Sequence, residues 1–186
     1  RRLLGYAFEW VLPGHGRPFT AFREALAEAH RRLRRLQDDP RAQGTALLRK
    51  MVIFQLLIYP VTDAALDTPS ARAITSDDFP LNRADMEWFW RQYLRDGADR
   101  AHPYASPARA KSLAGLPPAL VITAEIDPLC DEGKRYAAAL ERAGVSATCT
   151  RYEGVTHGFV GMEAMLDKGR AAVAESARAL RAALAA

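Results

Sequence analysis

The sequence predicts an α/β fold with a mostly parallel sheet of about three or four strands flanked by helices. Residues 119 to 126 are an apolar, β-branched run of strand length, and residues 147 to 152 form a second run of this kind. A helical pattern lies between them, so the three segments predict a βαβ unit with parallel strands. Residues 52 to 59 are a third strand pattern, closed by Pro60.

Each end of the helix in this unit has its own signal. Asp131 is a candidate N-cap, and Tyr136 and Leu140 lie on one apolar face of the helix that follows. Gly144 comes where a left-handed residue is favoured after a helix. We therefore expect the helix to run from about residue 131 to residue 143.

Two residues suited to proton transfer follow the two strands of the unit. Asp127 comes directly after the first strand, and His157 follows the second. Because the carboxyl ends of parallel strands meet at one edge of a sheet, we expect the two side chains to lie close together. A carboxylate bonded to one imidazole nitrogen fixes the tautomer, so the other nitrogen can take a proton from a nucleophile. The sequence thus predicts Asp127 and His157 as catalytic residues.

Between the strand at 52 to 59 and the βαβ unit, the sequence predicts two loops around one helix. Residues 61 to 80 are rich in turn-forming residues, and residues 98 to 118 read as a connecting loop with short helical turns. Asn82 is expected to cap the intervening helix, whose aromatic stripe on one face consists of Met86, Phe89, Trp90, Tyr93 and Leu94, with Trp88 next to it. Core packing is one interpretation of this stripe, and a wall of an acyl pocket is the other.

The chain ends in an alanine-rich helical pattern from about Gly169. Val173, Ala177, Leu180 and Leu184 follow one another at spacings of three and four residues, and we expect this face to pack against the sheet.

At the other end of the chain, residues 6 to 12 read as a strand, Pro13 to Pro18 as a turn, and residues 20 to 37 as a helix.

The composition excludes disordered and fibrous proteins. With 49% hydrophobic and 26% charged residues, the chain is typical of a globular domain. No apolar run reaches membrane-spanning length, and we expect a cytoplasmic protein without a membrane span. The two cysteines, Cys130 and Cys149, lack metal-site spacing and are expected to be buried or half-buried free thiols.

The net charge of +4 comes from the N-terminal part, since residues 1 to 54 hold eleven basic and five acidic residues. The arginine-rich stretch from His30 to Arg35 falls in the last turns of the predicted helix, where cations suit the helix dipole. We therefore predict a solvated helix face and no nucleic-acid partner.

Several segments together resemble a known family. Gln55 to Asp63 (QLLIYPVTD), Pro103 to Pro107, Leu116 to Ala119, Asp127 to Gly133 and His157-Gly158-Phe159 resemble the C-terminal half of the hormone-sensitive-lipase-like α/β-hydrolase esterases. The resemblance implies a partial α/β-hydrolase fold over residues 54–186. It also implies that Asp127 and His157 match the acid and base of the Ser…Asp…His triad of a serine esterase or lipase.

The nucleophile of that triad is missing from the pattern. The family carries a G-x-S-x-G elbow and an HGGG-like oxyanion segment, and neither occurs here. Ser106, in Tyr-Ala-Ser-Pro, precedes a proline without an adjacent base and reads as a turn residue. Since triad members act as a unit, we expect hydrolysis by this chain alone to be near background.

Residues 1–40 resemble something else. The stretch VLPGHGRP and the arginine-rich helix after it look like the C-terminal segment of metallo-β-lactamase-fold hydrolases, in which His15 would match a metal ligand. The H-x-H-x-D-H cluster that supplies most ligands of that site is missing, so we predict neither a metal nor a cofactor. We expect a segment of different origin at 1–40, a junction at 41–53 and the hydrolase part at 54–186, produced by a truncation with fusion, by rearrangement or by an assembly artefact.

Three functions stay open from the sequence. The first is a carboxylic-ester hydrolase that acts on a small ester and keeps the acid and base of its triad. The second is a non-catalytic remnant or binding module, and the third, on the weakest sequence signal, is a fragment of a zinc-dependent hydrolase. If the strand at 52 to 59 has no second neighbour, its apolar edge predicts self-association.

Overall fold

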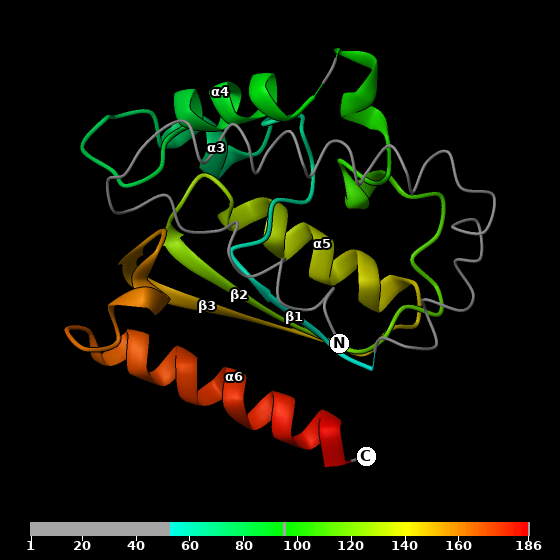
Figure 1. Cartoon of the computed structure of the whole chain (residues 1–186), viewed down its shortest axis with the longest axis vertical. Helices are drawn as coiled ribbons and strands as arrows, with labels where there is room; N and C mark the ends of the chain where they lie inside the picture. Colours follow the sequence, from blue (N-terminus) through cyan, green and yellow to red (C-terminus); the bar gives the residue numbers. More distant parts are fainter. Residues whose placement is uncertain (1–52, 95, 186) are drawn as a thin grey trace. The chain divides into compact units, whose positions relative to one another are not determined.

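Three parallel strands form the sheet in the computed structural model, which describes residues 53–94 and 96–185 (Figure 1). The strands are β1 (Gln55–Ile58), β2 (Ala119–Ile126) and β3 (Ala147–Thr156), and their order in the sheet is β1-β2-β3. Both pairings are parallel. The predicted fold class, an α/β fold with a parallel sheet flanked by helices, is confirmed.

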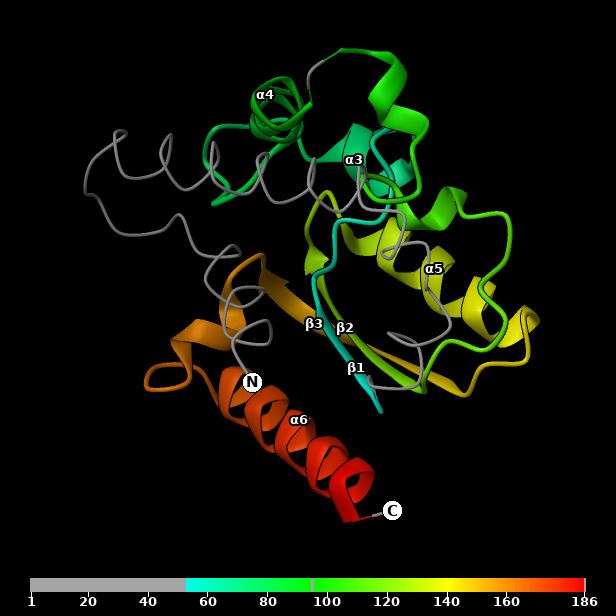
Figure 2. The same cartoon turned by 45° about the vertical axis from the view of Figure 1, so that its right-hand side comes forward.

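Helices cover both faces of this sheet. Helix α5 packs on one face, and the C-terminal helix α6 lies against the other (Figures 1 and 2). Helices α3 and α4 lie beyond the carboxyl ends of the strands, and α3 contacts α5 (Figures 1 and 2). The helices and 3-10 turns are α3 (Pro69–Ala73), α4 (Arg83–Tyr93), η1 (Ala98–Ala101), η2 (Pro107–Arg109), α5 (Cys130–Arg142), η3 (Phe159–Met162) and α6 (Asp167–Ala185).

Strand β1 is shorter and less buried than its sequence pattern predicted. Its four residues are all half-buried, whereas six of the eight residues of β2 are buried. The reason is position, because β2 lies between two strands and two helices, while β1 pairs only with β2 among the described residues. At each end of β1 a further backbone bond joins it to β2, from Gln55 N to Pro118 O and from Tyr59 N to Ile122 O.

The N-terminal end of helix α5 lies two residues earlier than expected, and Asp131 is not its cap. The N-cap is Leu129, which makes no side-chain capping bond, and Asp131 lies in the first turn. At the other end the prediction holds, since Gly144 has a φ of 77°. Its N–H bonds to Glu141 O and that of Val145 to Leu140 O, which is the Schellman arrangement.

The loop predicted for residues 61 to 80 contains the short helix α3. Thr68 caps it by accepting a hydrogen bond from Ala71 N, and Pro69 occupies the first helical position, where proline suits the backbone. The prediction for α4 is confirmed, because Asn82 and Asp85 form a complete capping box. Trp90 and Met86 are the buried members of its aromatic stripe, and the Trp88 ring meets Phe89 edge-on at 5.2 Å.

The face of α6 that packs on the sheet is not the predicted one. Its buried residues are Gly169, Ala172 and Ser176, and Ala179 packs against the same core. The larger apolar residues point outward, with Val173 43%, Leu180 38% and Leu184 74% exposed. The buried positions of α6 thus carry small side chains, and Gly169 packs against η3, where a Cβ would come within 2.8 Å of Phe159 O.

Two hydrophobic clusters form the core on the two sides of the sheet. The smaller cluster holds α5 against the sheet through Tyr136 and Leu140. The larger one includes Tyr59, Leu129 and Phe159, close to the carboxyl ends of the strands. The site residues described below are therefore set in the larger cluster.

Several predictions fall outside the described residues: the strand at 6 to 12, the helix at 20 to 37, His15 and the division at 41–53. Among the described residues no helix has the length and apolar character needed to span a membrane. Both cysteines are free thiols; Cys130 is buried as predicted, but Cys149 on the outer strand β3 is exposed.

Candidate active site

Asp127 lies directly after β2, where the strand ends and the turn into α5 begins. Its side chain is completely buried. One carboxylate oxygen, Oδ1, accepts a hydrogen bond from Leu129 N at 2.8 Å, and the backbone carbonyl accepts one from Cys130 N at 3.1 Å. The turn thus holds one carboxylate oxygen and leaves the other, Oδ2, for a partner from elsewhere in the chain.

His157 follows β3, which runs four residues further than predicted. A register shift makes this possible: Ala124 pairs with Tyr152, but Ile126 pairs with Thr156. Within the shift, Gly154 has a φ of 66°, and its N–H bonds to the Glu125 carboxylate at 2.6 Å. Bulges of this kind bend a strand and redirect the side chains that follow.

The two predicted catalytic residues are in contact. His157 Nδ1 lies 2.8 Å from Asp127 Oδ2, and the histidine side chain is 14% exposed. Because a carboxylate only accepts hydrogen bonds, Nδ1 is the donor, and in neutral imidazole Nε2 then carries no proton. Nε2 is the nitrogen that can act as a base.

The backbone on either side of His157 turns sharply. Gly158 has a φ of 87°, a conformation that side chains disfavour, and the 3-10 turn η3 begins directly after it. Phe159 is fully buried and anchors this turn in the core.

Tyr59, at the end of β1, completes the surroundings of the imidazole. Its ring centroid lies 4.6 Å from that of His157 at an interplanar angle of 49°. The phenol oxygen accepts a hydrogen bond from Val160 N at 2.7 Å. Tyr59 has a φ of 40°, a left-handed conformation that costs about 1–3 kcal/mol for a non-glycine residue. Burial raises the pKa of its phenol, so the ring beside His157 stays neutral.

The other acids near Asp127 have separate partners. Glu125 bonds to Arg151 and Gly154 N, and Asp131 bonds to Ser70 N and Lys134. Glu132 is buried, and its carboxylate accepts a hydrogen bond from Thr62 N at 2.6 Å. Of the described acids, Asp127 is therefore the one placed to orient His157.

The pKa of the Glu132 carboxyl group is raised by its surroundings. Burial raises its pKa to about 8, against two backbone hydrogen bonds, from Thr62 and Asp63, that lower it. The nearby charges of Asp63 and Asp127 raise it further. Glu132 joins the start of α5 to the loop after β1, and this loop also binds Asp131 through Ser70.

Sequence reasoning missed the contact of Tyr59 with His157 and the burial of Glu132 near Asp127. For Tyr59 the available signal was an aromatic residue directly before Pro60, at the end of β1. Strand β1 is the neighbour of β2, which Asp127 follows. For Glu132 the signal was an acid one turn into a helix beside a buried strand. Neither pattern is specific, because both occur often in cores and at helix starts.

Ser106 has the structural role that its sequence context predicted. It is fully buried, its hydroxyl donates to Arg100 O at 2.6 Å, and it accepts a hydrogen bond from Ala64 N at 2.9 Å. Both bonds tie loops together. A hydroxyl held in this way is not placed beside His157 as a nucleophile would be.

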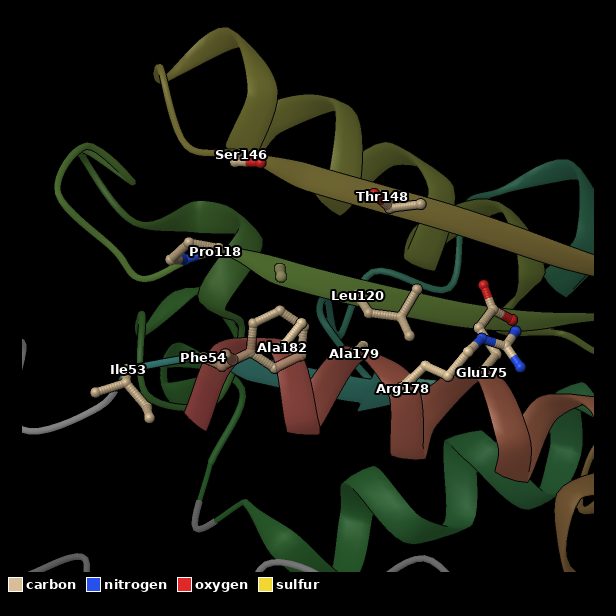
Figure 3. A pocket seen from close by; sticks show the side chains of 12 residues that line it. Ile53, Phe54, Pro118, Leu120, Ser146, Thr148, Glu175, Arg178, Ala179 and Ala182 are labelled. Atoms are coloured by element: carbon tan, nitrogen blue, oxygen red, sulfur yellow. The ribbon is translucent and has the colours of Figure 1, made fainter. Parts of the chain in front are cut away.

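A cavity of about 560 Å³ lies at the opposite end of the sheet from the Asp127 and His157 pair. Apolar side chains line it from the segment before β1 (Ile53 and Phe54), from β2 and from α6, together with polar side chains of Ser146, Thr148, Glu175 and Arg178 (Figure 3). Pro118 and Ser146 directly precede β2 and β3, so the cavity belongs to the amino ends of the strands, whereas Asp127 and His157 follow their carboxyl ends. The cavity is therefore separate from the candidate site.

Within residues 53–94 and 96–185, no group of three or more histidine, cysteine, aspartate or glutamate side chains is arranged to hold a metal ion.

Comparisons with known proteins support the same interpretation. A family model described as the alpha/beta hydrolase fold matches residues 27–161. The carboxylic ester hydrolase LipN of Mycobacterium tuberculosis is 41% identical over 131 residues, which cover 70% of this chain and 35% of that protein. The ethyl acetate hydrolase of Pseudomonas putida is 40% identical over 114 residues, which cover 61% of this chain and 36% of that protein.

Solved structures give similar results. A hyperthermophilic esterase from Pyrobaculum calidifontis superposes with a TM-score of 0.71 at 41% identity, over 78% of this chain and 48% of that one. The metagenomic carboxylesterase EstE1 superposes with a TM-score of 0.72 at 39% identity. The match covers 77% of this chain and 49% of EstE1. This chain thus spans about a third to a half of the length of these relatives.

The family match begins inside the segment 1–40, so residues 27–40 fall within the same match as the strands. These comparisons bring no support to the resemblance with metallo-β-lactamase-fold hydrolases. A matched region of 135 of 186 residues, relatives with about 40% identity and a parallel sheet with an acid and a histidine at its rim agree with one another. The chain belongs to the alpha/beta hydrolase fold family.

Proposed function

We propose that this chain carries the acid and base of a carboxylic-ester hydrolase, with His157 as general base and Asp127 as the carboxylate that orients it. The observation that carries the proposal is the 2.8 Å contact between His157 Nδ1 and the fully buried Asp127 Oδ2. Relatives named as carboxylic ester hydrolase, ethyl acetate hydrolase and esterase support a small ester as the substrate.

In the proposed mechanism His157 Nε2 takes the proton from an attacking hydroxyl and later gives it to the leaving alcohol. Asp127 stabilises the imidazolium that forms between these two steps. The hydroxyl belongs to a serine of a G-x-S-x-G elbow, and the six serines of this chain do not have that context. We therefore propose that the nucleophile and the oxyanion donors are supplied from outside this sequence.

A chimera tests the proposal. Residues 54–186 are joined to the N-terminal half of the P. calidifontis esterase, and hydrolysis of a short-acyl p-nitrophenyl ester is measured. We expect activity in the chimera and a loss of about a thousandfold or more in kcat with His157→Gln, because triad members act as a unit.

The control is His102→Gln, since His102 is exposed and its Nδ1 bonds only locally to Tyr104 N. It is expected to leave the rate unchanged. A folded chimera with the same rate before and after His157→Gln contradicts the proposal.

A second candidate is a binding module without catalysis. It is favoured by a relative that carries a receptor name, the gibberellin receptor GID1C of Arabidopsis thaliana, which is 36% identical over 112 residues. The chimera above separates the two candidates, and a serine-reactive fluorophosphonate probe tests whether the chain as it stands holds a reactive serine of its own. Labelling of a serine supports an enzyme complete in this sequence, and no labelling, with hydrolysis near background, leaves a half-site or a binding module.

The division at residues 1–40, 41–53 and 54–186, the truncation and fusion, and a cytoplasmic location stay predictions. The zinc-hydrolase alternative rests on the PGHG turn around His15 alone. Elemental analysis of the purified chain tests it, and stoichiometric zinc is the result that supports it.

A further inference from the structure

Tyr59 contacts the ring of the candidate base, whereas Asp127 contacts its Nδ1 atom. The Asp127 carboxylate accepts the Nδ1 hydrogen bond at 2.8 Å, and the ring of Tyr59 lies against the imidazole with centroids 4.6 Å apart. Tyr59 is only 4% exposed. Phe159 meets it edge-on, with centroids 5.7 Å apart, so the tyrosine ring is itself held in place.

The hydroxyl of Tyr59 makes a second connection to the same loop. It accepts the N–H of Val160, three residues after His157, at 2.7 Å. Gly158, one of the two residues between His157 and Val160, has a left-handed backbone conformation. Glycine has more conformational freedom than other residues. A turn with such a residue needs an additional tether if the histidine before it is to keep one orientation.

The backbone of Tyr59 is fixed independently of these contacts. Its N–H bonds to Ile122 O of the central strand at 2.8 Å. Its φ of 40° departs from the extended conformation of the strand and turns the chain at this residue. A large residue in this conformation persists only when its surroundings hold it, and such residues cluster at functional sites.

We propose that Tyr59 is a positioning residue for His157: its ring sets the orientation of the imidazole, and its hydroxyl tethers the turn at Val160. The inference rests on the proposed function, because a positioning residue matters only if the histidine acts as the base. The phenol keeps its proton over the working pH range, since burial raises its pKa, and the tether therefore does not change with pH.

The test uses NMR of the full chain uniformly labelled with nitrogen-15, so that both the histidine rings and the Val160 amide are observed. The resonances of His157 are assigned by their loss in His157→Gln, because the chain has four histidines. Two signals of the His157 ring are followed in each variant, beside hydrogen exchange at the Val160 amide. The low-field Nδ1 proton reports the bond to Asp127, and the carbon-bound ring protons report the ring current of Tyr59.

Two variants separate the two parts of the role. Tyr59→Phe keeps the ring and removes the tether; we expect the ring-current shift to remain and hydrogen exchange at the Val160 amide to accelerate about tenfold or more. Tyr59→Leu removes both, and we expect loss of the ring-current shift and broadening of the Nδ1 proton signal. If Tyr59→Leu does not fold, the Val160 exchange rate in Tyr59→Phe decides alone.

Tyr152→Phe is the matched control. The Tyr152 ring also packs against Phe159, with centroids 5.1 Å apart, but its hydroxyl bonds to Glu175 on α6. We expect the His157 signals and the Val160 amide to be unchanged in this variant. A similar effect from Tyr152→Phe means general loosening of the core and overturns the proposal.

The outcomes distinguish the two levels of inference. A wild-type chain without a low-field Nδ1 proton overturns the paired base of the proposed function and the role of Tyr59 with it. A wild-type chain with that signal, together with folded Tyr59 variants in which neither the His157 signals nor the Val160 exchange rate changes, overturns the role of Tyr59 alone.

Discussion

At the scale of single residues, burial is what makes Asp127 and Glu132 informative. Both are within 3% of complete burial, and acids in such places are held by hydrogen bonds or neutralised. Asp127 shares its two oxygens between Leu129 N and His157 Nδ1. Glu132 accepts backbone N–H groups of the loop after β1. We therefore expect substitutions of the two acids to change the stability of the fold in different ways.

For Asp127→Asn, we expect the free energy of unfolding to fall by about 1.5–3 kcal/mol, as for loss of a hydrogen bond to a charged group. The amide offers one acceptor where the carboxylate used two, and its NH₂ group faces a donor. Urea unfolding measures the change, and Asp78→Asn on the exposed loop before α4 is the control. Equal stability of Asp127→Asn and wild type argues against a tightly bound pair.

For Glu132→Gln, we expect stability to become less dependent on pH. The folded-state pKa is about 8, raised above the ordinary value of 4.5, so between these values the folded chain binds more protons than the unfolded chain. Stability from this group is present below about pH 4.5 and is lost as pH rises to about 8.

Each unit of pKa difference corresponds to about 1.4 kcal/mol, so the loss across this window reaches a few kcal/mol. Glu132→Gln removes the titrating group, and its unfolding free energy, measured by urea unfolding at pH 5 and pH 8, is expected to fall less than that of wild type between the two. Glu141→Gln on the exposed face of α5 serves as control. Parallel pH curves for wild type and Glu132→Gln contradict the prediction.

At the scale of elements, the contact between α5 and β2 depends on one small residue. Gly133 lies over Thr123, and a Cβ at that position would come within 2.8 Å of Thr123 Cγ2. The helix can therefore approach the strand that carries Asp127 only because position 133 has no side chain. The start of α5, which holds the Asp127 turn, is fixed by this close packing.

Gly133→Ala is expected to destabilise the chain by about 1–3 kcal/mol through overpacking, although alanine is the better helix former by about 1 kcal/mol. Thermal unfolding measures the effect. The double variant Thr123→Ser with Gly133→Ala removes the clashing methyl group and should recover much of the loss. No recovery in the double variant means that the cost does not come from this contact.

At the scale of the whole molecule, apolar side chains remain exposed on the outer face of α6. The outer face of α6 carries Val173, Leu180 and Leu184, and β1 has β2 as its single strand neighbour among the described residues. The chain also spans about a third to a half of its relatives. Exposed apolar side chains that form a continuous stripe favour association between molecules.

We expect the purified chain to self-associate at high concentration, as measured by light scattering. Replacing Leu180 and Leu184 together by glutamate is expected to shift the distribution toward smaller species, since it places charge on the stripe. Met165→Glu is the control, because Met165 is 81% exposed but precedes α6 and lies off the stripe. A wild-type chain that stays monomeric at high concentration contradicts this expectation.

The sequence by itself determined the strands, their parallel direction and the pairing of an acid with a histidine. Local signals sufficed for these: β-branched runs, the Asn82 capping box, Gly144 after α5, and chain order, which places the residues after two parallel strands at one edge. Such signals depend on a few neighbouring residues. The closeness of Asp127 and His157 could therefore be predicted from the sequence alone.

Only the tertiary structure decided which surfaces meet. The buried face of α6 consists of Gly169, Ala172 and Ser176 rather than its larger apolar residues, and Gly169 is buried against the backbone of η3. The contact of Tyr59 with His157 joins residues 98 positions apart, and the register shift in β3 sets where His157 points. These features depend on packing between distant segments, and no local pattern of residues encodes that packing.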